Sequence, residues 1–318
     1  LAASTSVAQP AETDADAVNR EAAGAEAQPA INDGPLFPVS TIDIGYVRPH
    51  PQQPEAEMLA EIRFEIGRID TGYVAPREGV EVIETSVAEL SSPSPKPFHA
   101  SGLQHVLEMV RDHLVVEEDL LGVFVAPDPR QITGTGVDRR PQGETGLNIV
   151  ITTGVVTEMR TIASGERVRE GGNIEPTERV NHPLHAHVLE RSPIEPTDAE
   201  DIEEEAQRSD LLRRSELDRY LFFLGRHPGR RVDASVGAAM DVGAVSLDYL
   251  VTENRPLVLY AQFANTGTSS TDYWRQRFGL LHTQLTNNDD ILSLDYTTAN
   301  FEDVHTVTMS YEAPFPNR

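Results

Sequence analysis

The sequence predicts an α+β fold, with two consecutive β-α-α-β-β units followed by the first antiparallel strands of an incomplete transmembrane β-barrel. Residues 257–313 alternate apolar and polar side chains with a period of two, and two earlier segments each read as a strand, two helices and two strands. No run approaches the roughly eighteen apolar residues of a membrane-spanning helix. Since backbone groups in lipid must be satisfied within helices or closed sheets, any membrane span must be β.

Residues 1–35 are rich in Ala, Glu, Asp and Pro and contain almost no large apolar side chains. Such a segment cannot offset the entropy of ordering, so we expect a disordered leader. Ser6-Val7-Ala8 has the small-residue pattern of a secretory cleavage site, and an N-terminus lost in cloning or in a fragmentary gene record is the alternative.

The first unit covers residues 36–153 and is predicted to be enlarged. Its clearest helix is 101–115, where apolar residues recur at i, i+3, i+4, i+7 and i+11. A helix is also predicted over 55–69, with a strand as the alternative near its end. The predicted strands are 39–47, 80–90, 120–126 and 147–152.

The second unit covers residues 154–254 and shows a cleaner pattern. Ser215-Glu216-Leu217-Asp218 resembles a capping box and predicts the start of its longer helix. The predicted strands are 155–163, 231–238 and 244–251, and a short helix is predicted over 182–190. The acidic stretch 195–210 is interpreted as a solvated insertion, because runs of like charge are usually solvated.

Residues 255–318 contain four predicted strands, 257–264, 273–281, 291–298 and 304–313. One face of these strands is apolar. The other carries Arg275 and Arg277, which we expect to point to the inner face of the barrel, to form part of a polar pore wall and to pair with Asp295 or Glu312. Solvated charges in a water-filled lumen are the alternative for these arginines. A soluble half-buried sheet shows the same alternation, so periodicity leaves both interpretations open.

Composition excludes several classes of function. The net charge of −25 argues against a nucleic-acid-binding protein, because phosphate recognition needs a basic face. It also argues against docking on anionic lipid through a polybasic patch. The chain has no cysteine, so disulfides and thiolate metal sites are excluded.

No motif supports catalysis, a cofactor or a metal. His182, His185 and His187 suggest metal ligation, but no obvious carboxylate lies at zinc-like spacing, and surface or helix-cap histidines are favoured. Asp289-Asp290 lacks the spacing of a calcium loop and is interpreted as a hairpin turn. Thr133-Gly134-Thr135-Gly136 precedes no helix, which argues against a phosphate loop. We therefore predict a protein that is not an enzyme.

Several short segments carry a family resemblance over residues 155–313. They are Ser192-Pro193-Ile194, Leu211-Leu212-Arg213, 217–221, 225–232, Leu247-Asp248-Tyr249, Tyr260-Ala261-Gln262, 265–268 and 289–292. With the order of parts, they resemble the two-partner-secretion transporters of the haemolysin/filamentous-haemagglutinin secretion–activation family, within the superfamily of outer-membrane insertases and translocases. The resemblance implies two periplasmic POTRA domains, each β-α-α-β-β, before a sixteen-stranded outer-membrane barrel in contact with lipid.

The resemblance also implies a function. Such a transporter exports one secreted partner, often a large β-helical adhesin or cytolysin, without nucleotide hydrolysis. The unfolded partner would add a strand to a POTRA sheet edge by β-augmentation. In the family this edge is the strand after the helices, which gives the predicted partner-binding residues Leu121, Val123 and Val125 in the first unit and Val232, Ala234 and Val236 in the second.

Two departures from the family pattern leave alternatives. The family's later barrel strands and loop arginine motif would lie beyond Arg318, so we expect a fragment truncated within its barrel. Residues 1–35 show no convincing plug helix. The alternatives are a general barrel-assembly insertase, which usually has more POTRA domains, and a soluble periplasmic POTRA binding module.

Overall fold

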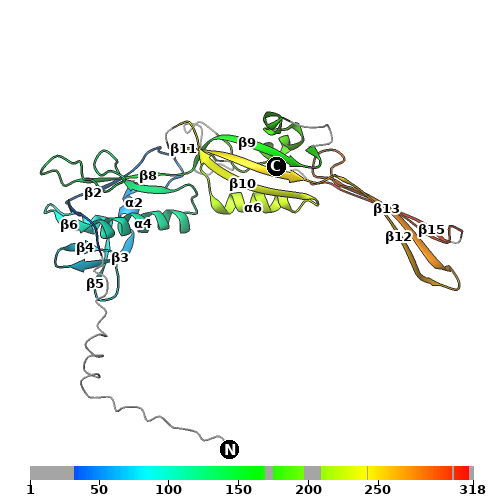
Figure 1. Ribbon diagram of the computed structural model, residues 1–318, viewed down its shortest axis with the longest axis horizontal. Coiled ribbons are helices and arrows are strands. Elements are labelled where there is room, and N and C mark those ends of the chain that lie inside the picture. The colour runs from blue at the N-terminus through cyan, green and yellow to red at the C-terminus, as the bar shows by residue number, and fades with distance from the viewer. Residues whose placement is uncertain (1–31, 169–174, 197–208, 242, 303, 315–318) are drawn as a thin grey trace, which may run out of the picture.

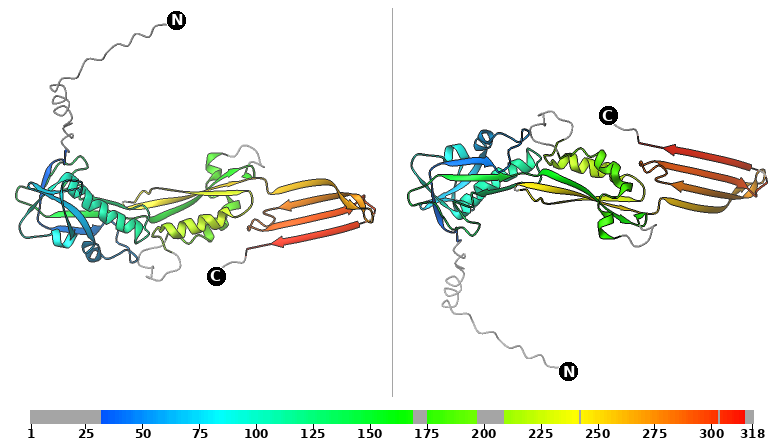
Figure 2. Two further views of the ribbon diagram at one scale, coloured as in Figure 1. Left: turned by 90° about the horizontal axis from the view of Figure 1, so that it is seen from below. Right: turned by 90° about the horizontal axis from the view of Figure 1, so that it is seen from above.

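The protein has three parts in a row (Figures 1 and 2). The computed structural model describes residues 32–168, 175–196, 209–241, 243–302 and 304–314. Most of the predicted leader (1–31) and most of the predicted acidic insertion (197–208) lie outside the described residues. Two small mixed sheets with helices are followed by a longer antiparallel sheet at the end of the molecule far from the first unit.

The first unit contains a three-stranded sheet in the order β2-β8-β7. Its elements are β2 (Ile42–Tyr46), α2 (Ala56–Ala60), α4 (Ala100–Val116), β7 (Phe124–Pro127) and β8 (Leu147–Thr152). β2 runs parallel to β8, and β7 runs antiparallel to β8. The predicted β-α-α-β-β order is therefore present.

The enlargement of this unit is a second sheet, inserted between α2 and α4. It has the order β1-β6-β4-β3-β5. Its elements are β1 (Leu36–Val39), β3 (Arg63–Ile69), β4 (Gly72–Val74), β5 (Glu81–Ser86), α3 (Val87–Leu90) and β6 (Lys96–His99). The insertion thus supplies most of a sheet that pairs with the start of the described chain.

Several predicted elements of this unit were wrong in extent. The predicted strand 80–90 ends at Ser86, and Val87–Leu90 form the helix α3. The predicted helix 55–69 ends at Ala60. β3 then buries Phe64 and Ile66 while Arg63 and Glu65 are exposed, a period of two that confirms the alternative of a strand near the end of this segment. The predicted strand 39–47 is divided, because Leu36–Val39 pairs with β6 and Ile42–Tyr46 pairs with β8. The apolar residues of this single segment therefore belong to strands of two different sheets.

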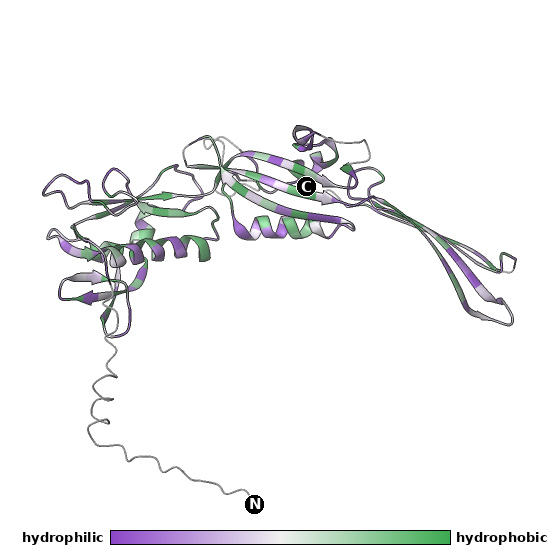
Figure 3. Cartoon of the chain, in the orientation of Figure 1, coloured by the Kyte–Doolittle hydropathy of each residue, from purple (hydrophilic) through white to green (hydrophobic). Residues whose placement is uncertain are grey.

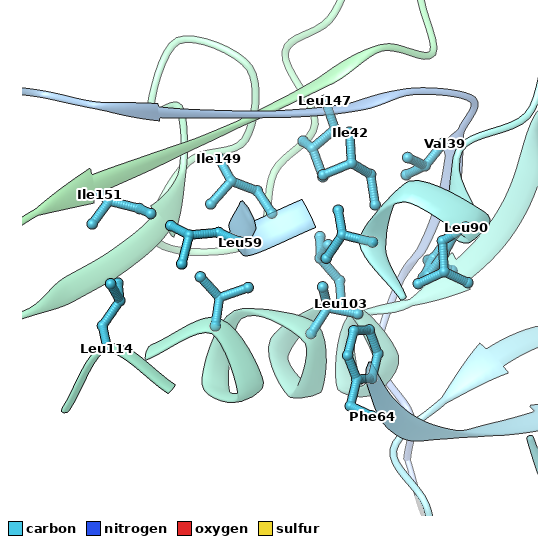
Figure 4. Close-up of a cluster of buried hydrophobic side chains, with 14 of the residues drawn as sticks. Val39, Ile42, Leu59, Phe64, Leu90, Leu103, Leu114, Leu147, Ile149 and Ile151 are labelled. Carbon is cyan, nitrogen blue, oxygen red and sulfur yellow. The ribbon is translucent and has the colours of Figure 1, made fainter. Parts of the chain in front are cut away.

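The first core lies between α4 and the β2-β8-β7 sheet (Figure 4). Alternate residues of β8, Leu147, Ile149 and Ile151, are fully buried and lie opposite the apolar stripe of α4, to which Leu103 and Leu114 belong. Burying one such side chain contributes about 1.5–3 kcal/mol to the stability of the fold, so these contacts hold α4 against the sheet.

The second unit repeats the same topology in the order β10-β11-β9. Its elements are β9 (Val155–Gly165), η2 (Pro176–Arg179), η3 (Pro183–His185), α5 (Ala186–Glu190), α6 (Arg214–Gly225), β10 (Arg230–Ala238) and β11 (Ala244–Glu253). β9 runs parallel to β11 and β10 antiparallel to it. Apolar and polar residues alternate along these strands (Figure 3), and the apolar set packs with Leu217, Tyr220 and Leu224 of α6.

The two units meet through backbone hydrogen bonds. Leu121 N–H donates to the Leu212 carbonyl at 2.9 Å, Gly154 N–H donates to Leu121 at 2.9 Å, and Leu212 N–H donates to Gly154 at 2.8 Å. A Cβ on Gly154 would lie 2.6 Å from the Leu121 oxygen, so only glycine allows this approach. Beside it, His50 Nε2 and Asp210 Oδ1 lie 2.7 Å apart in a buried pair.

The third part is a four-stranded antiparallel sheet in the order β12-β13-β14-β15. Its strands are β12 (Leu257–Thr268), β13 (Asp272–His282), β14 (Ile291–Ala299) and β15 (Val304–Glu312). Together with the two β-α-α-β-β units, this sheet confirms the predicted α+β class. Within the described ranges, no helix has the length and apolar composition that crossing a membrane requires.

Candidate functional site

The two faces of the β12–β15 sheet differ in chemistry. Cross-strand register places Leu259, Leu280, Leu294 and Met309 in one row, and Ala261, Phe278, Tyr296 and Val307 in the next row of the same face. Many side chains on this face are exposed: Leu259 is 68% exposed, Phe263 63% and Met309 66%. An exposed apolar surface of this kind marks a site of contact with lipid or protein.

The opposite face carries the four predicted pore-facing residues. Arg277 Nε donates to Asp295 Oδ1 at 2.8 Å. The Tyr260 side chain lies across Gly279, and its hydroxyl also donates to Asp295. Register places Arg275 opposite Ala299, whereas Glu312 lies opposite Ile291 at the other end of β14. The structure therefore brings Arg277 and Asp295 together and keeps Glu312 away from the arginines. Their position at a pore wall remains a prediction.

Both predicted edge strands lie at sheet edges, but their extents differ. β10 is the outer strand of its sheet, and Val232 and Ala234 pack partly on the second core while Val236 is exposed. β7 begins only at Phe124.

The predicted strand 120–126 therefore starts too early, because its first residues join the two units. Leu120 forms a single bridge with Arg213, and Leu121 is bonded to Leu212 and packs on the second core. Of the predicted residues in the first unit, only Val125 lies within β7.

A buried ionic cluster lies at the foot of β10, where the second unit meets the turn between β13 and β14. The Arg230 side chain is fully buried, Glu253 is 3% exposed and Asp289 is 8% exposed. Arg230 Nε donates to Glu253 Oε1 at 2.7 Å, and its guanidinium also donates to Asp289. Arg230 is the first residue of β10 and lies opposite Glu253, the last residue of β11. Because Arg230 also bonds to Asp289, these strand ends are held against the turn between β13 and β14.

Further cations and amides surround these carboxylates. His185 Nε2 lies 3.3 Å from Glu253, and His187 Nε2 lies 3.1 Å from Asp289. Arg167 donates to both Glu253 and Asn287, and Arg191 donates to Asn288. The turn residues 287–289 are therefore each held by a side chain of the second unit.

Burial and charge act in opposite directions on these carboxylates. Burial raises the pKa of Glu253, but the hydrogen bond with His185 and the charges of Arg230 and Arg167 outweigh it and hold the pKa well below its ordinary value. For Asp289, burial likewise raises the pKa, and His187 and Arg230 lower it well below the ordinary range. Both carboxylates are therefore ionised at neutral pH.

The sequence did not predict this cluster. His182 does cap a short helix, accepting from Leu184 N–H, but His185 and His187 are buried and not at the surface. Their partners, Glu253 and Asp289, lie 68 and more than 100 residues further along the chain, and Asp289 does lie in a turn between strands. Three arginines within the cluster, Arg167, Arg191 and Arg230, favour a structural ionic joint over a metal site. The described residues contain no group of three or more His, Asp or Glu that fits a metal ion.

The fold and these sites define a class: paired β-α-α-β-β units with an open strand edge, fixed to a sheet with one apolar and one polar face. No protein-family model matches the chain, and no curated protein matches it. The chain is similar to the solved structure of CdiB from Escherichia coli, with 12% identity and a TM-score of 0.48 over 91% of this chain and 40% of that one.

Two further solved structures are similar to the chain. CdiB from Acinetobacter baumannii shows 15% identity and a TM-score of 0.37, over 94% of this chain and 48% of that one. The N-terminal domain of Omp85 from the thermophilic cyanobacterium Thermosynechococcus elongatus shows 11% identity and a TM-score of 0.30, over 69% of this chain and 98% of that one. The chain thus spans less than half the length of either CdiB chain.

The similar structures also include POTRA domains 1–2 of the periplasmic domain of Omp85 from Anabaena, with 11% identity and a TM-score of 0.26 over 68% of this chain and 96% of that one. Every one of these TM-scores is below 0.5. The role of the chain is therefore a proposal that its own residues and geometry have to support.

Proposed function

We propose that this chain belongs to an outer-membrane protein transporter of the two-partner-secretion type. The two β-α-α-β-β units act as periplasmic POTRA domains, and β12–β15 form part of a transmembrane β-barrel. The units capture an unfolded secreted partner by β-augmentation, and the barrel passes it across the outer membrane. The partner class expected from the resemblance is a large β-helical adhesin or cytolysin.

The observation that carries this proposal is the two-faced sheet. In a soluble half-buried sheet the apolar face is covered by a second layer. Here Leu259, Phe263 and Met309 remain more than 60% exposed on one face, while Arg277 and Asp295 pair on the other. Strands of 9 to 12 residues also have the length that a tilted membrane strand needs.

Single cysteines test the membrane assignment, because the chain has none of its own. Met309 and Thr308 are neighbours on opposite faces of β15. In outer membranes of the expressing cell, we expect Thr308→Cys to react with a water-soluble maleimide. A bimane label on Met309→Cys should instead be quenched by brominated lipid. Equal reaction of both cysteines with the maleimide, without lipid quenching, would assign the sheet to a soluble module.

A gene deletion separates the transporter from an insertase. For the transporter we expect loss of one large protein from the culture medium, with the outer-membrane proteins unchanged. A general loss of barrel proteins from the outer membrane would instead identify an insertase of the same superfamily.

A further inference from the structure

The two strands that follow the helices offer very different open edges. β10 spans 9 residues and β7 spans 4. Each lies at the outside of a three-stranded sheet and pairs on one side only, β10 with β11 and β7 with β8. An unpaired edge is a template for another strand, so the number of free backbone groups on each edge decides which one can bind a partner.

The hydrogen bonds flanking β10 identify its free groups. Asn254 N–H donates to the Gly229 carbonyl at 2.9 Å, and Ala239 N–H donates to Ala244 at 3.2 Å, both in register with the β10–β11 ladder. In an antiparallel ladder, hydrogen-bonded pairs alternate with pairs that are not hydrogen-bonded. Odd-numbered residues of β10 therefore bond to β11. The even-numbered residues point to the open edge. Since Arg230 N–H already donates to the His227 carbonyl at 3.2 Å, the free N–H groups there are those of Val232, Ala234, Val236 and Ala238.

The same argument shows that β7 has few free backbone groups at its open edge. Asp128 N–H donates to the Asn148 carbonyl at 2.8 Å, in register with β7 and β8, so even-numbered residues bond to β8. The outward residues within β7 are then Val125 and Pro127, and proline has no N–H. Val125 supplies the one outward N–H of this strand, whereas β10 supplies four.

The side chains beside the free groups of β10 define what can bind there. Val232 and Ala234 lie on the face that packs on the second core with α6, and Val236 is exposed next to them. α6 itself leaves Phe222 and Phe223 exposed. The other face of β10 is polar, with Arg231 paired to Asp233. An added strand would thus meet an apolar face on one side and a polar face on the other.

We propose that the open edge of β10 is the partner-capture edge of this protein and that β7 is not. Its occupant is an extended segment of about seven residues, apolar at alternate positions and without acidic side chains. The length follows from the span of the four outward residues, and the net charge of −25 disfavours an acidic segment. This inference rests on the proposed capture by β-augmentation and specifies its site.

A synthetic peptide tests the site on the purified chain. The probe is a fluorescent peptide of about nine residues that alternates Val and Thr between terminal lysines. Amide hydrogen exchange is measured with and without it. We expect added protection at Val232, Ala234 and Val236, no change at Val125, and much weaker binding of a matched peptide with Glu in place of Thr.

A proline variant tests the hydrogen bonds. Ala234→Pro removes an outward N–H without removing a bond to β11, because proline is tolerated on the free side of an edge strand. We expect binding at least about tenfold weaker, from the lost bond and the clash with the added strand. Ala234→Val keeps the N–H and is the matched control, with wild-type affinity expected within about twofold.

The outcomes separate this inference from the proposed function. Protection at Val125 instead of Ala234 would overturn the choice of β10 and leave capture by strand addition intact. Protection at neither strand, despite binding of the peptide, would overturn strand addition itself. If Ala234→Pro does not fold, the exchange data on the unmodified chain still decide between the two edges.

Discussion

The two β-α-α-β-β units have the same sheet order but pass to the next part of the chain in different ways. The first unit ends at Thr152 and enters the second through Gly154, whose close backbone contacts leave no room for a side chain. The second ends at Glu253 in a buried ionic cluster with Arg230 and Asp289. The same topology is thus followed by two different joints: close backbone packing beside a single buried pair, His50 and Asp210, in the first, and a larger buried ionic cluster in the second.

The two units also differ in the strand that follows their helices, β7 in the first and β10 in the second. The first unit carries an additional sheet, and its edge strand is short and ends at Pro127. The second keeps a long regular edge that begins at Arg230, within the ionic cluster. The first unit therefore offers little open edge at the strand that follows its helices. The second combines the open edge with the attachment to the β12–β15 sheet.

The largest expected effect comes from removing Arg230, the arginine that pairs with both carboxylates of the second joint. Arg230→Met leaves Glu253 and Asp289 buried without their shared partner, which we expect to cost about 3–5 kcal/mol of unfolding free energy. Denaturant unfolding, followed by the fluorescence of Trp274, the single tryptophan, measures it. Arg231→Met is the matched control, because that side chain is 78% exposed, and should change stability by less than about 0.5 kcal/mol. Equal effects of the two variants would mean that the cluster is solvated.

The same joint predicts a dependence on pH. The folded-state pKa values of Glu253 and Asp289 are lowered, so their stabilising contribution is complete above the ordinary carboxyl pKa and is lost as pH falls below it. We expect the unmodified protein to lose stability between neutral pH and about pH 3, and Glu253→Gln to lose less over that interval. Parallel curves for the two proteins would contradict the assignment.

The first joint should respond strongly to added volume at Gly154. Gly154→Ala places a Cβ 2.6 Å from the Leu121 oxygen, and the required shift should cost about 1–3 kcal/mol. Gly134→Ala is the control, since nothing lies within 4 Å of its Cβ, and should be nearly neutral. Thermal unfolding of the three proteins measures both effects. A neutral Gly154→Ala would show that this joint is loose.

Local periodicity predicted the elements but not the contacts between them. The stripe of Leu103, Val106, Val110 and Leu114 identified α4, because one helical period explains all four residues. Met58, Leu59 and Ile62 fit a helical period, but the helix ends at Ala60, before the predicted end at residue 69. Phe64 and Ile66 instead follow the period of a strand. In the same way, alternation predicted all four strands of β12–β15.

The candidate site was predictable only where its residues were close in register. Arg277 and Asp295 lie on adjacent strands, so parity alone put them on one face. His185 and Glu253 are 68 residues apart, and no local pattern indicates that they meet. The free backbone groups of β10 depend on which residues of the ladder are hydrogen-bonded, which a sequence does not specify.

The smallest expected effect compares an exposed ion pair with the buried one. Arg277 and Asp295 form a pair like that of Arg230 and Asp289, but the Arg277 side chain is 47% exposed. Water screens such a pair, so Arg277→Gln should lower the unfolding free energy far less than Arg230→Met does, measured by the same Trp274 fluorescence. Arg275→Gln is the matched control, since register places Arg275 opposite Ala299. A loss as large as that of Arg230→Met would mean that the polar face of β12–β15 is screened from water. It would then be the face that packs against protein, and the interpretation of the two faces of the sheet would have to be reversed.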